Sequence, residues 1–171
     1  VINFQSELGP VWVIARKPKA PVVSHDGQLE ESDYSWHRDR VGAWMSSQRT
    51  SAQLRLELSF EQVGNPAVLG SLVGVDLAMY HYKNHVQGTV FNKAPQLESK
   101  GLTSKQKDTL VAGAVARASA MNLSRHLVNM PPNTMNPDTM EKFVVKHFKS
   151  RANVKVDVWH VDRLRAEKMH L

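Results

Sequence analysis

The chain has 171 residues, 42% of them hydrophobic and 22% charged, which is enough for one folded domain, or for a small domain and part of another, and argues against disorder. It contains no cysteine, which excludes disulfides and thiolate chemistry and fits a reducing compartment such as the cytoplasm. The net charge of +6 permits contact with nucleic acid, but the basic residues are scattered and follow no known nucleic-acid motif, so a solvated basic surface is the preferred interpretation.

Neither a membrane span nor a leader is expected. The longest apolar stretch, residues 67–80, is interrupted by Asp76 and falls short of the roughly 20 residues needed to cross a bilayer. No signal peptide and no initiator methionine open the sequence. Residues 1–4 resemble the interior of a protein, and we expect a fragment or a processed chain.

The first sixty residues predict strand, loop, helix and strand. Residues 11–15 form a short apolar run that predicts a buried strand, and residues 18–30, with two prolines and a glycine, predict a loop. Apolar residues recur at helical spacing over 31–49, which predicts a helix. Strict alternation of apolar and polar residues over 53–60 predicts a half-buried strand.

A second helix is predicted to begin at Asn65 and Pro66, because asparagine caps helix starts and proline suits the first turn. We expect it to end near Asn84. Asp76 is the one carboxylate on its otherwise apolar face, and a role in packing, as the partner of an arginine or of the backbone, is favoured over general-base chemistry. Residues 88–91 then predict a third strand, and residues 92–102 predict a loop.

The longest predicted helix begins at a capping box, in which Thr103 caps the first turn and Gln106 reaches back to it. It is expected to reach about Leu127, which is long enough for a strut between two domains. Its predicted packing face is rich in small side chains and comprises Val111, Ala114, Val115, Ala118 and Met121.

An abrupt corner follows this helix. Pro131 cannot continue a helix, and Pro132 repeats the stop. Asn129 and Asn133 flank the two prolines, and we expect their side chains to bond the backbone groups that the prolines leave free. Asn136 then caps a new helix that begins with a proline.

The remaining residues predict helix, strand and helix. A core-facing apolar stripe runs over 136–148, alternation over 154–158 predicts a strand, and Asp162 is expected to cap a last helix. Elements in this alternating order favour a parallel α/β sheet. The stripe comprises Met140, Phe143, Val144, His147 and Phe148, and the last helix holds Leu164 and Met169.

Three segments of the sequence resemble a known protein family. The segment VAGAVARASAMNLSRHLVNMPPNTMNPDTMEKFVVKHF is similar to a junction in the leucyl aminopeptidase family of dinuclear-metal exopeptidases, where an alanine-rich helix meets an Asn-x-Pro-x-Asn corner and a proline-initiated helix. The corner here is Asn129-Met130-Pro131-Pro132-Asn133, and Arg125 and Leu127 also match the pattern. VGVDLAMYHYKNH resembles the helix that ends the family's amino-terminal domain, and VKVDVWHVDRLRAEKMHL resembles the strand and helix after the corner.

The resemblance implies a partial α/β fold in three parts. Residues 1–102 would be the later part of an amino-terminal, macro-like α/β domain, 103–128 a linker helix, and 129–171 the opening helix, strand and helix of an α/β catalytic domain. The parent enzyme would be a cytoplasmic, hexameric metalloaminopeptidase that uses two divalent metal ions, zinc or manganese, to release N-terminal residues from peptides. The chain stops before the family's metal-binding lysine, aspartates and glutamate. We therefore expect no catalytic residue and no metal ligand here, and a scaffolding role in complex with the remainder of the same precursor.

Independent catalytic signals are weak. His81 and His85 lie four residues apart on a predicted helix, but Tyr82 stands where zincin chemistry requires a glutamate. His126 and His147 lie near predicted core faces, where a hydrogen-bonded structural role is favoured. The alternative to an enzyme fragment is a stand-alone basic α/β module with a regulatory or nucleic-acid-binding role.

Overall fold

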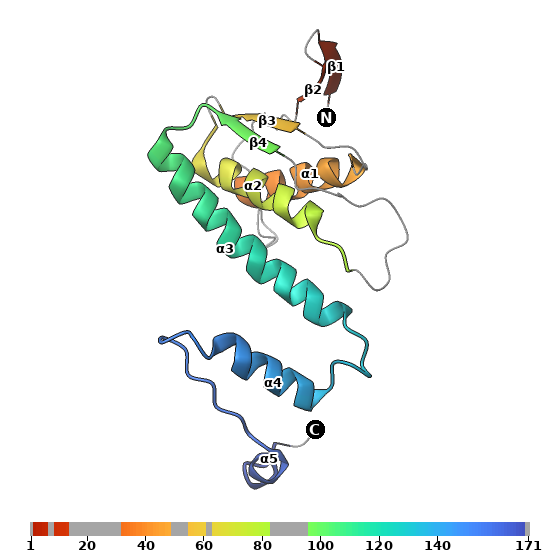
Figure 1. The fold of residues 1–171 in the computed structure, drawn as a ribbon, viewed down its shortest axis with the longest axis vertical. Coiled ribbons are helices and arrows are strands. Elements are labelled where there is room, and N and C mark those ends of the chain that lie inside the picture. The colour runs from red at the N-terminus through yellow and green to blue at the C-terminus, as the bar shows by residue number, and fades with distance from the viewer. Residues whose placement is uncertain are drawn as a thin grey trace, which may run out of the picture. The chain divides into compact units, whose positions relative to one another are not determined.

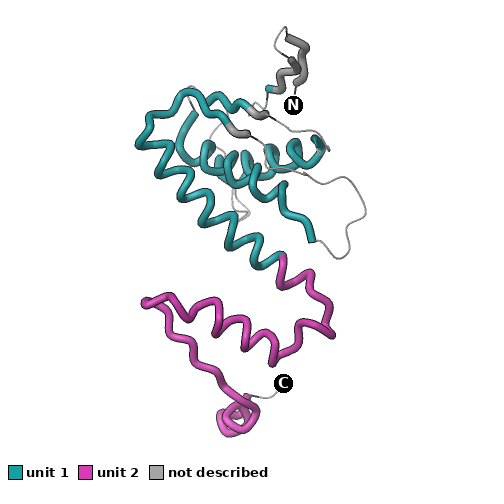
Figure 2. Tube along the Cα trace, in the orientation of Figure 1, with its two compact units in different colours: residues 1–125 teal, residues 126–171 magenta. Residues whose placement is uncertain are grey.

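The computed structural model describes residues 2–6, 9–13, 32–48, 55–60, 63–82 and 96–169. This part of the chain is mainly helical and includes a small parallel sheet, which is compatible with a partial α/β fold. The chain divides into two compact units, residues 1–125 and residues 126–171 (Figure 2). The elements in chain order are β1 (Ile2–Ser6), β2 (Gly9–Val13), α1 (Asp33–Ser47), β3 (Arg55–Ser59), α2 (Asn65–Met79), β4 (Gln96–Lys100), α3 (Ser104–Asn129), α4 (Pro137–Phe148) and α5 (Val161–Ala166) (Figure 1).

β1 and β2 form an antiparallel pair in which Ile2 lies opposite Val13 and Ser6 opposite Gly9. The predicted strand at 11–15 overlaps β2, while its last two residues and the predicted loop at 18–30 lie outside the described residues. The predicted helix at 31–49 is confirmed as α1, which Ser32 caps by accepting a hydrogen bond from the Ser35 N–H at 3.1 Å.

β3 confirms the predicted strand at 53–60, and it pairs in parallel with β4, from Arg55 opposite Gln96 to Ser59 opposite Lys100. The prediction of a loop over 92–102 is therefore wrong for residues 96–100, while residues 92–95 lie outside the described residues. β4 carries a single large apolar residue, and only the ladder to β3 makes it a strand, which local sequence does not encode. The predicted strand at 88–91 lies outside the described residues.

α2 is confirmed and begins at Asn65 as predicted, but the capping role of Asn65 and the predicted end of the helix are wrong. Gly64 occupies the N-cap and the Asn65 side chain makes no capping bond, so Pro66 alone accounts for the start signal. The helix ends at Met79, well before the predicted Asn84, because Tyr80 takes an extended backbone conformation (φ −66°, ψ 133°). No glycine or proline marks this stop, which is why the sequence did not reveal it.

α2 is the centre of the first unit, because it is buried against both α1 and α3. Three glycines, Gly42 of α1 and Gly70 and Gly74 of α2, let the backbones of the two helices approach closely. A β-carbon at Gly70 would overlap the carbonyl oxygen of Tyr34, and one at Gly74 would overlap that of Arg38. One side of α2 packs on α1 in a cluster formed by Val41, Met45, Val75 and Ala78. Another side packs on β3 and α3 in a cluster formed by Phe60, Val68, Leu72, Val73, Leu77, Leu110, Ala114 and Ala118.

α3 begins with the predicted capping box. The Thr103 N–H donates to Gln106 Oε1 at 3.1 Å, and the Gln106 N–H donates to Thr103 Oγ1 at 3.4 Å. The predicted packing face is right for Ala114 and Ala118, whereas Val115 is 52% exposed. The buried stripe is rotated toward Leu110, which lies in one cluster with Ala114, Ala118 and the apolar side chains of α2.

The second unit contains no buried side chain in either of its helices. α4 begins as predicted, with Asn136 Oδ1 accepting a hydrogen bond from the Thr139 N–H at 3.0 Å. The predicted strand at 154–158 is not present in the described structure, because no described segment pairs with it and a strand exists only in a ladder.

α5 is shorter than predicted, and His160, without a side-chain capping bond, occupies its N-cap position in place of Asp162, which lies in the first turn. It ends before Met169 in a Schellman arrangement, in which the Met169 N–H donates to the Leu164 carbonyl at 2.9 Å and the Lys168 N–H to the Arg165 carbonyl at 3.0 Å. Lys168 holds the left-handed position of this motif, at φ 57°.

Replacing Gly74 by alanine tests the close approach of α1 and α2. The added methyl group would overlap the Arg38 carbonyl oxygen, so we expect a loss of about 1–3 kcal/mol in the free energy of unfolding. The matched control is Gly113→Ala on α3, whose β-carbon would meet only the flexible ends of Arg117 and Leu69, at 3.2 and 3.6 Å. That change should be neutral or stabilising by up to ~1 kcal/mol, from helix propensity. Equal effects of the two substitutions in denaturant titrations would contradict the predicted packing.

Candidate functional site

The most distinctive polar feature of the first unit lies where α2 meets α3. The two helices run in the same direction, as shown by Leu69, early in α2, lying against Gly113 of α3, and by Asp76 lying against Asn122 further along both helices. A hollow of about 170 Å³ opens between them. Its walls are aliphatic or thioether side chains apart from one carboxylate. The lining residues are Leu72, Val75, Asp76, Met79, Val111, Ala114 and Val115.

Asp76 is half-buried in this cleft, and its Oδ1 accepts a hydrogen bond from Asn122 Nδ2 at 3.0 Å. Burial raises the pKa of the Asp76 carboxyl above its usual value, and the hydrogen bond from Asn122 offsets part of that rise. The predicted packing role of Asp76 is confirmed in kind. Its partner is an amide of α3 and not the expected arginine or backbone group.

An arginine does reach α2, but at the end of the helix. Arg125 Nη1 donates to the Leu77 carbonyl oxygen at 3.0 Å, and its guanidinium lies 6.0 Å from the centre of the Tyr80 ring. This carbonyl lies in the last turn of α2, where a cation is favoured, and it also accepts the Tyr80 N–H at 3.4 Å. Arg125 therefore stabilises the end of α2 and is engaged away from Asp76.

Sequence reasoning matched Arg125 to a family pattern but gave it no contact, and it missed Asn122. The sequence did contain a pattern that places both residues on the face of α3 toward α2. Asn122 follows the buried Ala118 by four residues and Arg125 follows it by seven, so both continue the stripe that faces α2. A polar residue on such a stripe indicates a partner on the facing helix.

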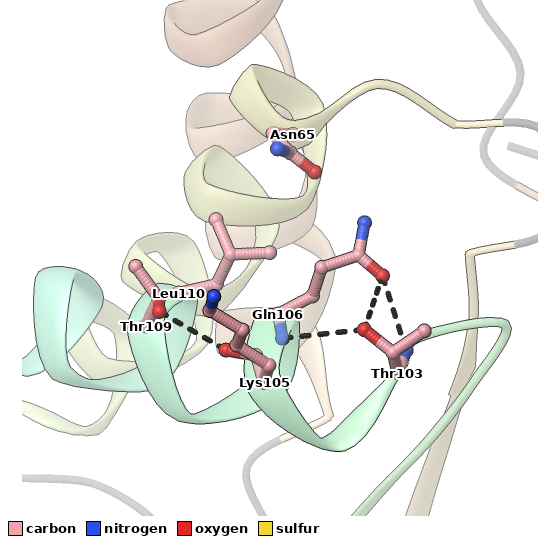
Figure 3. A pocket seen from close by; sticks show the side chains of 6 residues that line it. All are labelled: Asn65, Thr103, Lys105, Gln106, Thr109 and Leu110. Atoms are coloured by element: carbon pink, nitrogen blue, oxygen red, sulfur yellow. Dashed lines mark hydrogen bonds between the residues drawn. The ribbon is translucent and has the colours of Figure 1, made fainter.

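A second hollow, of about 230 Å³, lies at the start of α3 (Figure 3). Its polar groups largely satisfy one another. Thr103 and Gln106 form the capping box, and Thr109 Oγ1 donates to the Lys105 carbonyl oxygen at 3.0 Å. Asn65 and Lys105 are exposed at its rim. The arrangement completes a helix start and presents no set of groups for chemistry.

The corner residues are all exposed or half-buried, and backbone bonds close the turn. The N–H groups of Thr134 and Met135 donate to the Pro131 carbonyl oxygen at 2.9 and 2.8 Å. Asn129 is exposed and has no side-chain bond to the backbone in the described structure, while Asn133 accepts from Thr134 Oγ1 at 3.5 Å. The expected bonds from Asn129 and Asn133 to freed backbone groups are therefore not seen, and Pro132 is exposed.

The histidines do not gather into a site among the described residues. His81 lies beyond the end of α2, with Nδ1 3.5 Å from the Met79 carbonyl oxygen, and His85 lies outside the described residues. The prediction that His81 lies on a helix is thus wrong, since α2 ends at Met79. His126 and His147 are exposed, and His147 contacts the rings of Phe143 and Phe148 with centroids 5.7 and 4.9 Å away.

Comparison with known proteins leaves the chain without an assigned family. No protein-family model matches the sequence, and no curated protein matches it. Within the described segments, no three histidine, aspartate or glutamate side chains lie together as a metal site would require. In the same segments, no helix combines the length and apolar character needed to span a bilayer.

Asp76→Asn tests the cost of the half-buried carboxylate. The raised pKa means that the folded chain binds this proton more readily than the unfolded chain does, so Asp76 makes stability fall as pH rises from the ordinary carboxyl range through the raised pKa. The amide of Asn has no such titration. We expect the melting temperature of Asp76→Asn, relative to the natural chain, to increase between about pH 4 and pH 7. Asp108→Asn, at an exposed position of α3, is the control, and the same trend in both variants would contradict the prediction.

The variants Asn136→Ala and Asn129→Ala compare how much each of these two asparagines contributes to stability. Asn136 supplies a side-chain cap to α4, so its loss should cost about 1 kcal/mol in the free energy of unfolding. Asn129 is exposed, and its replacement should cost less than about 0.5 kcal/mol. Chemical denaturation of both variants checks the order, and a larger cost at Asn129 would restore the expectation that its side chain fixes the corner.

Proposed function

We propose that this chain is the non-catalytic amino-terminal portion of a cytoplasmic metalloaminopeptidase of the leucyl aminopeptidase type. Residues 1–102 would belong to its amino-terminal α/β domain, 103–128 to its linker helix, and 129–171 to the opening of its catalytic domain. The proposal rests on the sequence of α3, the corner and α4, in which a 26-residue helix leads directly into Pro131, Pro132 and a proline-initiated helix. Its role would be to scaffold the catalytic domain and to support a homo-hexamer.

The uncovered apolar face of α4 supports this proposal. Phe143, Val144 and Phe148 lie on one stripe and stay only half-buried, and Met140 is 39% exposed. A soluble helix with so strong an apolar face is stable when that face packs on another layer. The remainder of a catalytic α/β domain is a suitable cover, and the alternating segment 154–158 would gain ladder partners in its sheet.

The two divalent metals of such an enzyme find no place in this part of the chain. The described residues offer no group of three side chains that could hold a metal, so they do not fit a dinuclear centre. In the proposed enzyme, the zinc or manganese ions would be bound by the remainder of the precursor.

Peptidase assays on two proteins test the assignment. Residues 1–171 alone should not hydrolyse leucine p-nitroanilide with added Mn²⁺ or Zn²⁺, while the protein expressed from the complete reading frame should do so in a metal-dependent way. Chelation followed by addition of metal is the control for dependence. The assignment fails if residues 1–171 are active by themselves, or if the complete reading frame shows no metal-dependent release of the amino-terminal residue.

Light scattering after size exclusion addresses the assembly. The complete protein should elute as a hexamer. The isolated chain should self-associate, because the apolar face of α4 is left half-exposed among the described residues. A soluble, cooperative 19.2 kDa monomer would argue for a stand-alone module, and nucleic-acid binding by that monomer would favour the alternative function.

A further inference from the structure

We propose that the cleft between α2 and α3 binds a small aliphatic primary ammonium ion, with Asp76 holding the charge. The inference concerns residues 63–82 and 104–125 and does not depend on the peptidase assignment. Three features of the cleft carry it: a carboxylate without a cation, aliphatic walls, and an opening to solvent.

Asp76 lacks a compensating cation among the described residues. Its hydrogen bond comes from the neutral amide of Asn122, and the arginine nearest along α3, Arg125, is bound to the Leu77 carbonyl oxygen. A half-buried carboxylate without a counter-charge is unfavourable, because the apolar surroundings replace water without replacing its favourable interaction. A ligand that brings a positive charge and several N–H donors would remove this cost.

The amide that contacts Asp76 leaves a second acceptor unused. Asn122 donates through Nδ2, and its Oδ1 is buried without a hydrogen-bond partner in the described structure. Buried acceptors are normally satisfied. Asn122 is not among the residues that line the hollow, so a bound cation would contact the Asp76 carboxylate, which the Asn122 amide holds in place.

The aliphatic lining of the cleft favours an alkyl group as the remainder of the ligand. Leu72, Val75 and Met79 of α2 face Val111 and Val115 of α3 around a hollow of about 170 Å³. Since a cavity of roughly 15 Å³ on a comparable measure already holds one water, there is room for a short branched alkyl chain. Val111 is 39% exposed and Val115 52%, so the cleft opens to solvent and a ligand can enter without unfolding.

A bare metal ion is a poorer occupant. Calcium and magnesium take several oxygen ligands, and Asp76 is the only carboxylate that lines the cleft. A guanidinium is planar and is best matched by two oxygens of one free carboxylate, whereas Oδ1 of Asp76 is already engaged by Asn122. The compact ammonium needs only one free oxygen and leaves its alkyl chain to the walls.

Isothermal titration calorimetry of the full chain with 3-methylbutylammonium at neutral pH tests the proposal, and it detects the site in a monomer or an oligomer alike. We expect saturable binding with one site per chain. The neutral isostere 3-methylbutan-1-ol should bind at least about tenfold more weakly, because it lacks the charge. Inability of the natural chain to bind the amine, or equal binding of amine and alcohol, overturns the proposal.

Three variants locate the site. Asp76→Asn should weaken binding of the amine at least about tenfold. Val115→Phe, which places bulk in the cleft at a half-exposed position without touching the carboxylate, should weaken amine and alcohol together. Asp108→Asn, an exposed carboxylate of α3 outside the cleft, should leave the affinity unchanged. If Asp76→Asn does not fold, the other two variants and the alcohol comparison decide; undiminished binding by Val115→Phe, or equal losses in Asp76→Asn and Asp108→Asn, overturns the assignment.

Discussion

The close approach of the α1 and α2 backbones is the constraint on which the first unit depends. Gly70 and Gly74 place no side chain between the helices, and carbonyl groups of α1 occupy the space where their β-carbons would be. Gly42 contributes from the other side, because its β-carbon would lie 3.2 Å from the Gly74 carbonyl oxygen. Such contact brings many atoms within van der Waals range, and it leaves no room for a one-carbon change without movement of the backbone.

This arrangement gives α2 two packing surfaces. Val75 and Ala78 are buried with α1, while Val68 and Leu72 are buried with α3 and Phe60. A helix enclosed on several sides is apolar nearly all round, and this explains why α2 reads as one apolar run with a single carboxylate. In such a helix a polar side chain requires a partner on a neighbouring helix, and Asn122 serves Asp76 in that way.

The polar contacts between α2 and α3 also set the register of the two helices. The apolar contacts of Leu72 and Ala114 tolerate small shifts, because they have no direction. Two hydrogen bonds are less tolerant of such shifts, because each requires a donor within about 3 Å of its acceptor. They join Asn122 to Asp76 and Arg125 to the Leu77 carbonyl oxygen. The polar residues in this otherwise apolar interface thus fix the alignment of the two helices, and Asp76 among them also supplies the charge of the proposed binding cleft.

The second unit contrasts with the first in how little it buries. Its corner is closed by two backbone bonds to the Pro131 carbonyl oxygen, and α5 ends in backbone bonds around Lys168. Asp157, Trp159 and Arg163 form a small exposed cluster, with the Trp159 N–H donating to Asp157 at 3.0 Å and Arg163 stacked 4.0 Å from the Trp159 ring. Local bonds define these turns, and α4 contains no fully buried side chain among the described residues.

The sequence by itself determined the helices and most of their starts. Capping boxes, asparagine caps and prolines act through neighbouring backbone groups, so Thr103, Gln106 and Asn136 could be read directly. The strand β4, the end of α2 at Met79, and the partners of Asp76 and Arg125 were decided only by the tertiary structure. The physical reason is the separation along the chain between interacting residues. A cap is completed within four residues, whereas a strand ladder, a buried face or an interhelical hydrogen bond joins residues some forty positions apart. Those pairings exist only once the helices have packed.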